Sequence, residues 1–229
     1  MAMSPPVTIA ILSVTGILGP SVLQAIAEHP RALDVRIRVL TRPMSAEKAH
    51  TIVAEYPTLY LTVHAIDYAG EGGGEPARGG FGLLPGFIAQ DAVARAAKAA
   101  GVRLFVPSEF GAPTHSMPLD SENYILGKRY HHDLLRRLEL PYLLVYTGML
   151  PQTEPAPTPL PPLTAAEPIP LGQPPFETTR YHVATYLMQL LLDRGVEAVA
   201  GGIYVIRGLR RDRGIVSSET GKTEWVLDV

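Results

Sequence analysis

The sequence predicts an α/β protein built on a doubly wound parallel sheet. Strand-like and helix-like segments alternate along the first 150 residues, as they do when helices cover both faces of such a sheet. Near the N-terminus, an apolar run leads directly into a glycine-bearing turn and a helix start. With 229 residues, the chain is long enough to bury one substantial core with a small appended lobe.

The amino-acid composition excludes several classes of binding partner and of chemistry. The chain is 46% hydrophobic and 18% charged with a formal net charge of -2, a balance that argues against nucleic-acid or anionic-membrane surfaces. It has no cysteine, which excludes disulfides and thiolate chemistry. No apolar run approaches the roughly 18 residues of a membrane span, and no signal peptide is evident. We therefore expect a cytoplasmic protein with a small-molecule partner, and the sequence does not predict its oligomeric state.

The elements of the first half have clear boundaries. Pro20 suits the first turn of a helix over residues 21–29, and Pro30 ends that helix. Gly101 suits the left-handed position that ends a helix over residues 88–100. Strands are expected at residues 7–12, 35–40, 59–63, 102–106 and 142–146, with further helices at 45–55 and from 120 or 121 to 137.

Two stretches interrupt this alternation. Residues 69–86 hold eight glycines and two prolines, which predicts a loop. Residues 151–175 hold ten prolines, which excludes a helix interior or a central strand. The predicted division is therefore a nucleotide-binding domain at 1–150, a proline-rich connector at 151–175 and a smaller lobe at 176–229. In that lobe we expect a helix at 178–193 stopped by Gly195, a strand at 202–206 and a helix within 211–220.

The first turn has the composition of a dinucleotide site. A strand, a tight turn and a helix start direct free backbone N–H groups and the positive end of the helix dipole at one spot, where a pyrophosphate fits. The G-x-G-x-x-G pattern is incomplete, because Ser13 stands where its loose variant has glycine. The predicted pyrophosphate contacts are Ser13, Thr15, Gly16, Ile17, Leu18 and Gly19.

Basic residues follow the second predicted strand. Arg42 comes directly after it and Lys48 lies one helical turn further on, with no carboxylate before Glu47. In a dinucleotide fold this turn meets the adenosine ribose, where an acidic residue binds a 2′-hydroxyl and arginine binds a 2′-phosphate. The sequence therefore favours NADP(H) over NAD(H).

Three residues of the middle region are candidates for chemistry. Ser108 ends an apolar segment and is expected at the carboxyl edge of the sheet, where open α/β folds bind ligands. Tyr124 and Lys128 are four residues apart and share one face of a helix. There the ammonium lowers the pKa of the phenol, which makes it a better proton donor to a carbonyl.

Other polar residues are weaker candidates for a functional site. His131 and His132 are adjacent on a helix and point about 100° apart, which makes them poor joint metal ligands. We expect them on the helix surface and predict no metal site. Glu109 beside Ser108 is compatible with a hydrolase pair, but the chain has no G-x-S-x-G nucleophile elbow.

The chain resembles the NmrA-like and isoflavone-reductase-like proteins, atypical members of the short-chain dehydrogenase/reductase superfamily. The resemblance spans residues 7–150 and is patchy over 176–206. It is carried by Gly16 and Gly19, by the segment 97–111 with its Val-Pro-Ser-Glu-Phe-Gly block, by Lys128, and by the segments 138–142 and 147–148. It implies a Rossmann-like fold, Lys128 as the catalytic or nicotinamide-ribose lysine, Arg42 and Lys48 as 2′-phosphate contacts, and Gln90 on the cofactor side. Tyr124 is not a usual feature of the isoflavone-reductase branch.

The chain also departs from the family. The family's fourth strand, expected between Asp67 and Gln90, has no good counterpart among residues 69–86. The proline-rich connector stands where the family supplies much of its substrate lobe. We therefore expect an incomplete family member with a reduced substrate lobe.

Three functional interpretations follow. The leading one is an NADP(H)-dependent oxidoreductase that reduces a small carbonyl or enone-type substrate by hydride transfer. Here Ser108 holds the substrate oxygen, Lys128 orients the ribose or donates a proton, and Tyr124 is a second candidate acid. The alternative is an NmrA-like regulatory or redox-sensing protein that binds NAD(P) without turnover. The third is a fragment that binds nothing.

Overall fold

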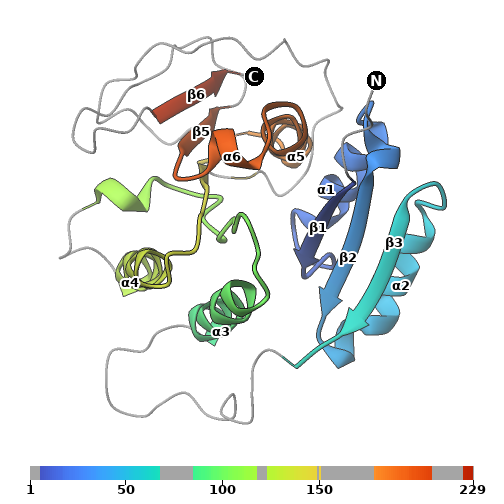
Figure 1. Ribbon diagram of the computed structural model, residues 1–229, viewed down its shortest axis with the longest axis horizontal. Coiled ribbons are helices and arrows are strands. Elements are labelled where there is room, and N and C mark those ends of the chain that lie inside the picture. The colour runs from blue at the N-terminus through green and yellow to red at the C-terminus, as the bar shows by residue number, and fades with distance from the viewer. Residues whose placement is uncertain are drawn as a thin grey trace. The chain divides into compact units, whose positions relative to one another are not determined.

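Two three-stranded sheets, each with helices packed beside it, make up the described part of the chain (Figure 1). The structure is a computed structural model and describes residues 6–67, 85–117, 123–148, 150, 178–207 and 224–228. The chain divides into two units. The first unit contains Met1–Asp67 and Arg180–Gly195, and the second contains Tyr68–Thr179 and Val196–Val229.

The sheet of the first unit is parallel. It contains β1 (Val7–Leu12), β2 (Val35–Thr41) and β3 (Tyr60–Ala65) in the order β1-β2-β3. Leu12 pairs with Leu40, and Thr41 pairs with Ala65. The carboxyl ends of the three strands therefore meet at one edge of the sheet, and so do the loops that follow them.

Strand β2 shows how the sequence determines this sheet. Val35, Ile37 and Val39 are buried, whereas Arg36 and Arg38 between them are exposed. Successive side chains of a strand point to opposite faces, so this alternation gives one covered and one open face. The predicted half-exposed strand is confirmed.

Helices from both ends of the first unit's sequence pack together. This unit contains α1 (Gly19–Glu28), α2 (Ala46–Ala54), α5 (Arg180–Met188) and the π-helical segment Gln189–Arg194. Helix α1 packs against α5. Polar contacts join them: Tyr181 Oη donates to Glu28 at 2.9 Å, His29 and Asp193 lie 3.3 Å apart, and Arg31 donates to the carbonyl of Leu192.

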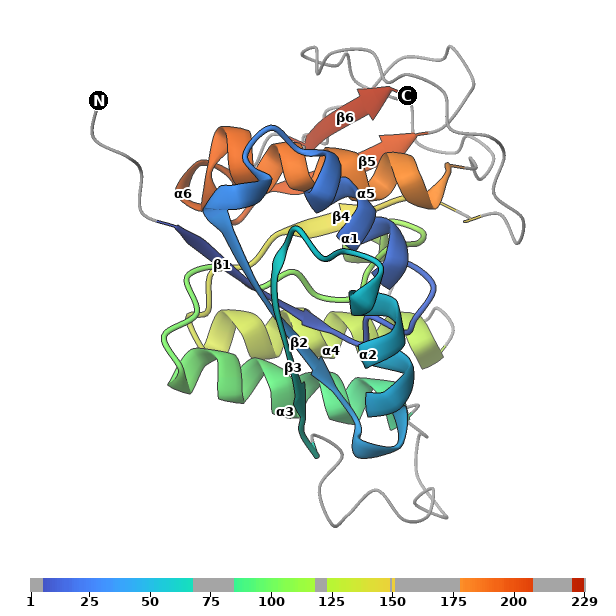
Figure 2. The same cartoon turned by 90° about the vertical axis from the view of Figure 1, so that its right-hand side faces the viewer.

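The second unit has its own parallel sheet. Its strands are β4 (Leu144–Tyr146), β5 (Ile203–Arg207) and β6 (Glu224–Asp228), in the order β4-β5-β6. Its helices are α3 (Pro85–Ala99), α4 (Asn123–Arg137) and the short α6 (Val196–Val199). Helices α3 and α4 lie side by side (Figure 2). One small core lies between them and the following segment; it contains Ala94, Leu135 and Leu140, with Phe105 and Tyr142 packed against it.

Most predicted elements are confirmed and some are corrected. All described strand pairs are parallel, and Pro20 lies in the first turn of α1 as expected. The left-handed conformation expected at Gly101 is confirmed by its φ of 68°. The predicted helix stop at Gly195 is also confirmed, since the helical segment ends at Arg194. The helix predicted through residue 193 continues from α5 into π-helical geometry.

The strand predicted at residues 102–106 is wrong. It is reduced to a single parallel bridge between Phe105 and Tyr142. The partner segment contains Pro141, which has no N–H to donate, and Pro107 follows on the other side, so the ladder cannot extend. The strand predicted at 142–146 is shortened to β4 (Leu144–Tyr146), which pairs with β5 from Leu144 onward.

Several predictions fall outside the described residues. These are the loop at 69–84, the connector at 151–175 and the helix within 211–220, while residues 85 and 86 begin α3. Strand β6 was not predicted. The division into domains at 150 and 175 stays a prediction. In the described residues, no helix has the length and apolarity needed to cross a membrane.

Candidate functional site

The turn after β1 brings backbone groups close together. Ser13 has a φ of 64°, its N–H donates to the carbonyl of Leu40 at 3.0 Å, and its carbonyl accepts from Gly16 at 2.8 Å. A Cβ on Gly19 would lie 2.0 Å from the carbonyl oxygen of Val14. Glycine is therefore required at the start of α1, because the helix begins directly against the turn.

Much of the turn that leads into α1 is exposed, although Gly19 itself is buried. No side chain caps the N-terminus of this helix, and its first turn has no acidic residue. Ser13 and Gly16 are exposed, and Ile17 is 69% exposed. The positive end of the helix dipole and uncapped backbone N–H groups are therefore available to an anion.

Arg42 and Lys48 belong to the same unit as this turn. Arg42 follows β2 two residues after Leu40, whose carbonyl accepts the Ser13 N–H, so it lies at the same edge of the sheet. Lys48 belongs to α2. Both side chains are exposed, and in the described part of the chain neither has a hydrogen-bond or ion-pair partner. The residues present thus fit a nucleotide with several phosphates.

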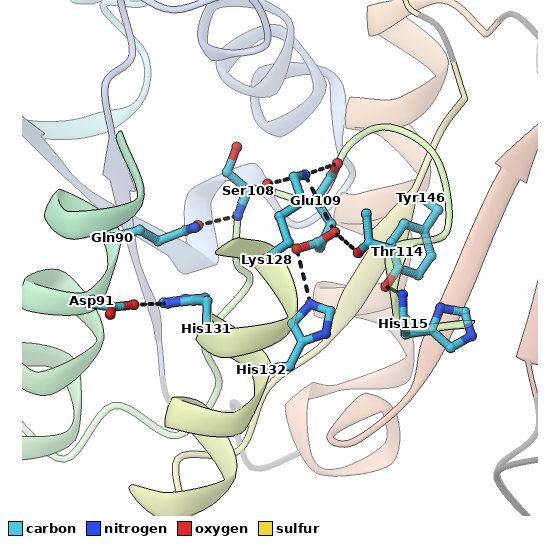
Figure 3. Close-up of polar contacts among 10 residues, drawn as sticks. All are labelled: Gln90, Asp91, Ser108, Glu109, Thr114, His115, Lys128, His131, His132 and Tyr146. Atoms are coloured by element: carbon cyan, nitrogen blue, oxygen red, sulfur yellow. Dashed lines mark hydrogen bonds and ion pairs between the residues drawn. The ribbon is translucent and has the colours of Figure 1, made fainter. Parts of the chain in front are cut away.

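Ser108, Gln90 and Lys128 meet in the second unit (Figure 3). The N–H of Ser108 donates to Oε1 of Gln90 at 2.6 Å. Lys128 Nζ donates to the carbonyl of Ser108 at 2.9 Å and to that of Glu109 at 2.8 Å. The structure therefore brings together three residues that the sequence nominated separately.

Lys128 is largely buried. Its side chain is 14% exposed, and Nζ also lies 3.4 Å from Oε2 of Glu109. Burial lowers the pKa of the Lys128 ammonium below its ordinary value, and the Glu109 carboxylate opposes this decrease. The ammonium thus has an acceptor for each of its three N–H groups.

Glu109 is the centre of the cluster, a role that the sequence analysis did not predict when it named this residue beside Ser108. Its carboxylate is fully buried and accepts from Thr114 Oγ1 at 2.7 Å and His132 Nε2 at 3.0 Å, besides Lys128. Burial alone would raise the pKa of Glu109. The hydrogen bond from His132 and the charge of Lys128 outweigh burial, so the pKa lies below its ordinary value.

The surface placement predicted for the two histidines is wrong. His131 and His132 are 1% and 2% exposed. His131 Nδ1 lies 2.5 Å from Asp91 on α3, and His132 lies on Glu109. A signal existed: His132 is four residues after Lys128 and three before the buried Leu135, which places all three on one helix face.

Tyr124 belongs to the first turn of α4, but its side chain lies outside the described residues. Its pairing with Lys128 therefore stays a prediction. In the portion of the chain that the structure describes, no group of three or more histidine or acidic side chains is arranged to hold a metal ion.

Parallel sheets, flanking helices and a glycine turn after the first strand define a Rossmann-like α/β fold. No protein-family model matches the chain, and no curated protein sequence does. Solved structures do match. Leucoanthocyanidin reductase of Vitis vinifera with NADPH has a TM-score of 0.60 and 16% identity, over 97% of this chain and 78% of that chain.

Two further structures are similar. The structures of pinoresinol-lariciresinol and phenylcoumaran benzylic ether reductases give a TM-score of 0.62 at 18% identity, over 90% of this chain and 71% of theirs. An isoflavone reductase gives 0.57 at 18% identity, over 97% of this chain and 78% of that chain. The expected resemblance to isoflavone-reductase-like proteins is thus confirmed at the level of the fold.

Proposed function

We propose that the protein is an NADP(H)-dependent oxidoreductase that reduces a small carbonyl or enone-type substrate by hydride transfer. The observation that carries this proposal is the start of α1 at the sheet edge of the exposed Arg42, both without a side-chain partner among the described residues. The names of the similar structures support it: all are reductases, and one contains NADPH.

The first unit holds the residues for the nucleotide. The turn from Ser13 to Gly19 would bind the pyrophosphate through backbone N–H groups, and Arg42 and Lys48 would bind a 2′-phosphate. When bound, NADPH supplies the hydride. An arginine beside the ribose prefers the phosphate to a hydroxyl, so NADPH is expected to bind more tightly than NADH.

In the second unit, Ser108 would hold the substrate oxygen. It is exposed, and in the described residues its hydroxyl has no partner. A hydroxyl in this position donates to a carbonyl oxygen and stabilises the negative charge that develops there during reduction. Tyr124 is a candidate proton donor at the start of the helix that carries Lys128.

One observation favours a second function, an NmrA-like protein that binds NAD(P) as a signal without turnover. The three N–H groups of Lys128 are all directed at acceptors of its own chain. A lysine held in this way has no N–H group directed at a substrate, which favours a structural role.

Nucleotide binding is tested first by thermal unfolding with NADPH and with NADH. At about one hundred times its dissociation constant, a ligand stabilises the folded state by roughly 2.7 kcal/mol. We expect Arg42→Gln to abolish the preference for NADPH, since a charge-assisted hydrogen bond contributes about 1.5–3 kcal/mol. Arg38→Gln, an equally exposed change inside β2, is the control. A wild-type protein that NADPH does not stabilise would falsify the proposal.

Turnover then separates the two functions. NADPH oxidation is followed by stopped flow against a panel of aromatic enones. Oxidation that depends on the enone establishes a reductase, whereas binding without oxidation across the panel establishes the nucleotide-sensing alternative.

A further inference from the structure

Ser108 has an unusual backbone environment. It lies in the segment between α3 and α4, outside any helix or strand. Side chains from the two flanking helices nevertheless bind both the backbone N–H and the backbone C=O of the residue. Gln90 of α3 accepts its N–H at 2.6 Å, and Lys128 of α4 donates to its C=O at 2.9 Å.

Lys128 has no N–H group left over in this arrangement. An ammonium has three donors, and its three acceptors are the carbonyls of Ser108 and Glu109 and the carboxylate of Glu109. A general acid needs a proton directed at the substrate. The Lys128 ammonium is directed instead at the Ser108–Glu109 backbone.

Lys128 is itself held in position by Glu109. Glu109 approaches Lys128 with a carboxylate that Thr114 and His132 also bind. The titratable groups facing this carboxylate are Lys128 and His132, both from α4. A sequence of contacts therefore runs from His132 through Glu109 and Lys128 to Ser108, and it begins at a fully buried group.

We propose that Lys128 and Gln90 are positioning residues that hold the backbone of Ser108, whose hydroxyl is the substrate contact of the proposed function. In Figure 3 the hydroxyl points away from both residues. A donor fixed before the substrate arrives needs no reorganisation during the reaction. The role toward substrate rests on the proposed function, whereas the positioning does not.

The positioning is tested without activity, by hydrogen exchange of the segment 105–111 in the full chain. Gln90→Met removes the acceptor at nearly the same size, and Gln90→Glu keeps it. We expect Gln90→Met to accelerate exchange of the Ser108 amide about tenfold, the effect of one hydrogen bond, and Gln90→Glu to leave it protected. A Ser108 amide that exchanges in the wild type as fast as an unstructured peptide overturns the positioning.

Activity tests the assignment of roles, with an aromatic enone that supports NADPH oxidation. Ser108→Ala is expected to lower kcat about 100-fold, and Ser108→Thr to retain most of the activity. Lys128→Met is expected to lower kcat and leave the shape of its pH profile unchanged. If Lys128 were the proton donor, the decline of kcat at alkaline pH would disappear in Lys128→Met, and our assignment would be wrong.

The two proposals fail in different ways. A protein that binds NADPH without oxidising it in the presence of any enone overturns the reductase function, and with it the substrate contact of Ser108. The exchange measurement still decides whether Gln90 and Lys128 hold the segment. Unchanged kcat in Ser108→Ala overturns the substrate contact alone.

Discussion

At the scale of single residues, Glu109 has the environment with the largest consequences for stability. Its carboxylate is fully buried and bound by a hydroxyl, an imidazole and an ammonium. Burial of a charge is costly unless partners compensate for the lost water. The cluster is therefore stable as a set, and removal of one member leaves the others buried without a partner.

Glu109→Gln is expected to lower the free energy of unfolding at neutral pH by about 3–5 kcal/mol, the usual effect of breaking a buried ion pair. The measurement is urea denaturation. Glu197→Gln removes an exposed carboxylate paired with Arg103, and exposed pairs contribute about 0–1 kcal/mol. Equal decreases in the free energy of unfolding in the two variants would show that the Glu109 cluster stabilises the fold no more than an exposed ion pair does.

The same residue predicts a pH dependence. Because the pKa of Glu109 is lower in the folded protein than its ordinary value, its stabilisation is fully present above the unfolded-state pKa. The stabilisation is lost as pH falls through the folded-state pKa. The free energy of unfolding, measured from neutral to acid pH, should therefore fall less steeply in Glu109→Gln than in the wild type.

Ser13 predicts a stabilising substitution. Its φ of 64° lies in the left-handed region, which costs a residue with a Cβ about 1–2 kcal/mol and glycine almost nothing. We expect Ser13→Gly to raise the free energy of unfolding by about 1 kcal/mol. Thr15→Gly, in the same turn at a residue without positive φ, should instead lower it. A loss of stability in Ser13→Gly would contradict the strain argument.

Gly19 predicts the opposite outcome. Gly19→Ala places a Cβ 2.0 Å from backbone atoms that cannot rotate away, and the expected loss is about 3 kcal/mol or more. Gly101→Ala, with φ of 68° but nothing within 4 Å, should lose only about 1 kcal/mol. Thermal unfolding compares the two, and a similar loss in both would show that the turn adapts.

The sequence predicted part of the candidate site. Ser108, Gln90 and Lys128 were nominated from position and resemblance, and the structure brings them together. Glu109 and His132 were missed as members of the cluster because their burial depends on how α4 lies against the 108–114 segment. A single sequence does not reveal such packing directly. The spacing of Lys128, His132 and Leu135 does place them on one helix face, which is compatible with the burial of His132.

At the scale of elements, the periodicity of apolar residues located most helices and strands. It failed where the pattern of backbone hydrogen bonds, rather than the apolar spacing, determines the type of element. Residues 102–106 are mostly apolar, but Pro141 and Pro107 limit their pairing to one bridge. The π-helical segment after α5 has the same apolar spacing as an α-helix, so composition does not distinguish it. The end of this helix at Gly195 was predictable from the sequence, because glycine adopts a positive φ, here 85°, without steric cost.

The assignment of α5 and the following π-helical segment to the first unit is testable by comparing one core residue from each unit. Leu190 is 0% exposed in the π-helical segment, and Leu144 is 2% exposed in β4. Either leucine changed to alanine is expected to lose about 2–5 kcal/mol. Hydrogen exchange should increase mainly in α1 and the first sheet for Leu190→Ala, and mainly in β4 and β5 for Leu144→Ala. Identical exchange patterns would show that the two units do not respond separately.

At the scale of the whole molecule, the chain enters the first unit twice, at Met1–Asp67 and Arg180–Gly195. A fragment of residues 1–67 lacks the partner that covers α1. We expect this fragment to be poorly folded by circular dichroism and to gain helical signal when a peptide of residues 180–195 is added. A peptide of scrambled order is the control, and a fully folded fragment without any peptide would contradict the expectation.

The meeting of three strand ends at one edge of the first sheet has a consequence for adaptation. The ladders end at residues 12, 41 and 65, so replacement of Arg42 or its neighbours leaves every strand-to-strand bond intact. Under the proposed function, coenzyme preference can therefore change through Arg42 with little effect on the free energy of unfolding, because the residue proposed to select the coenzyme lies outside the strand ladders.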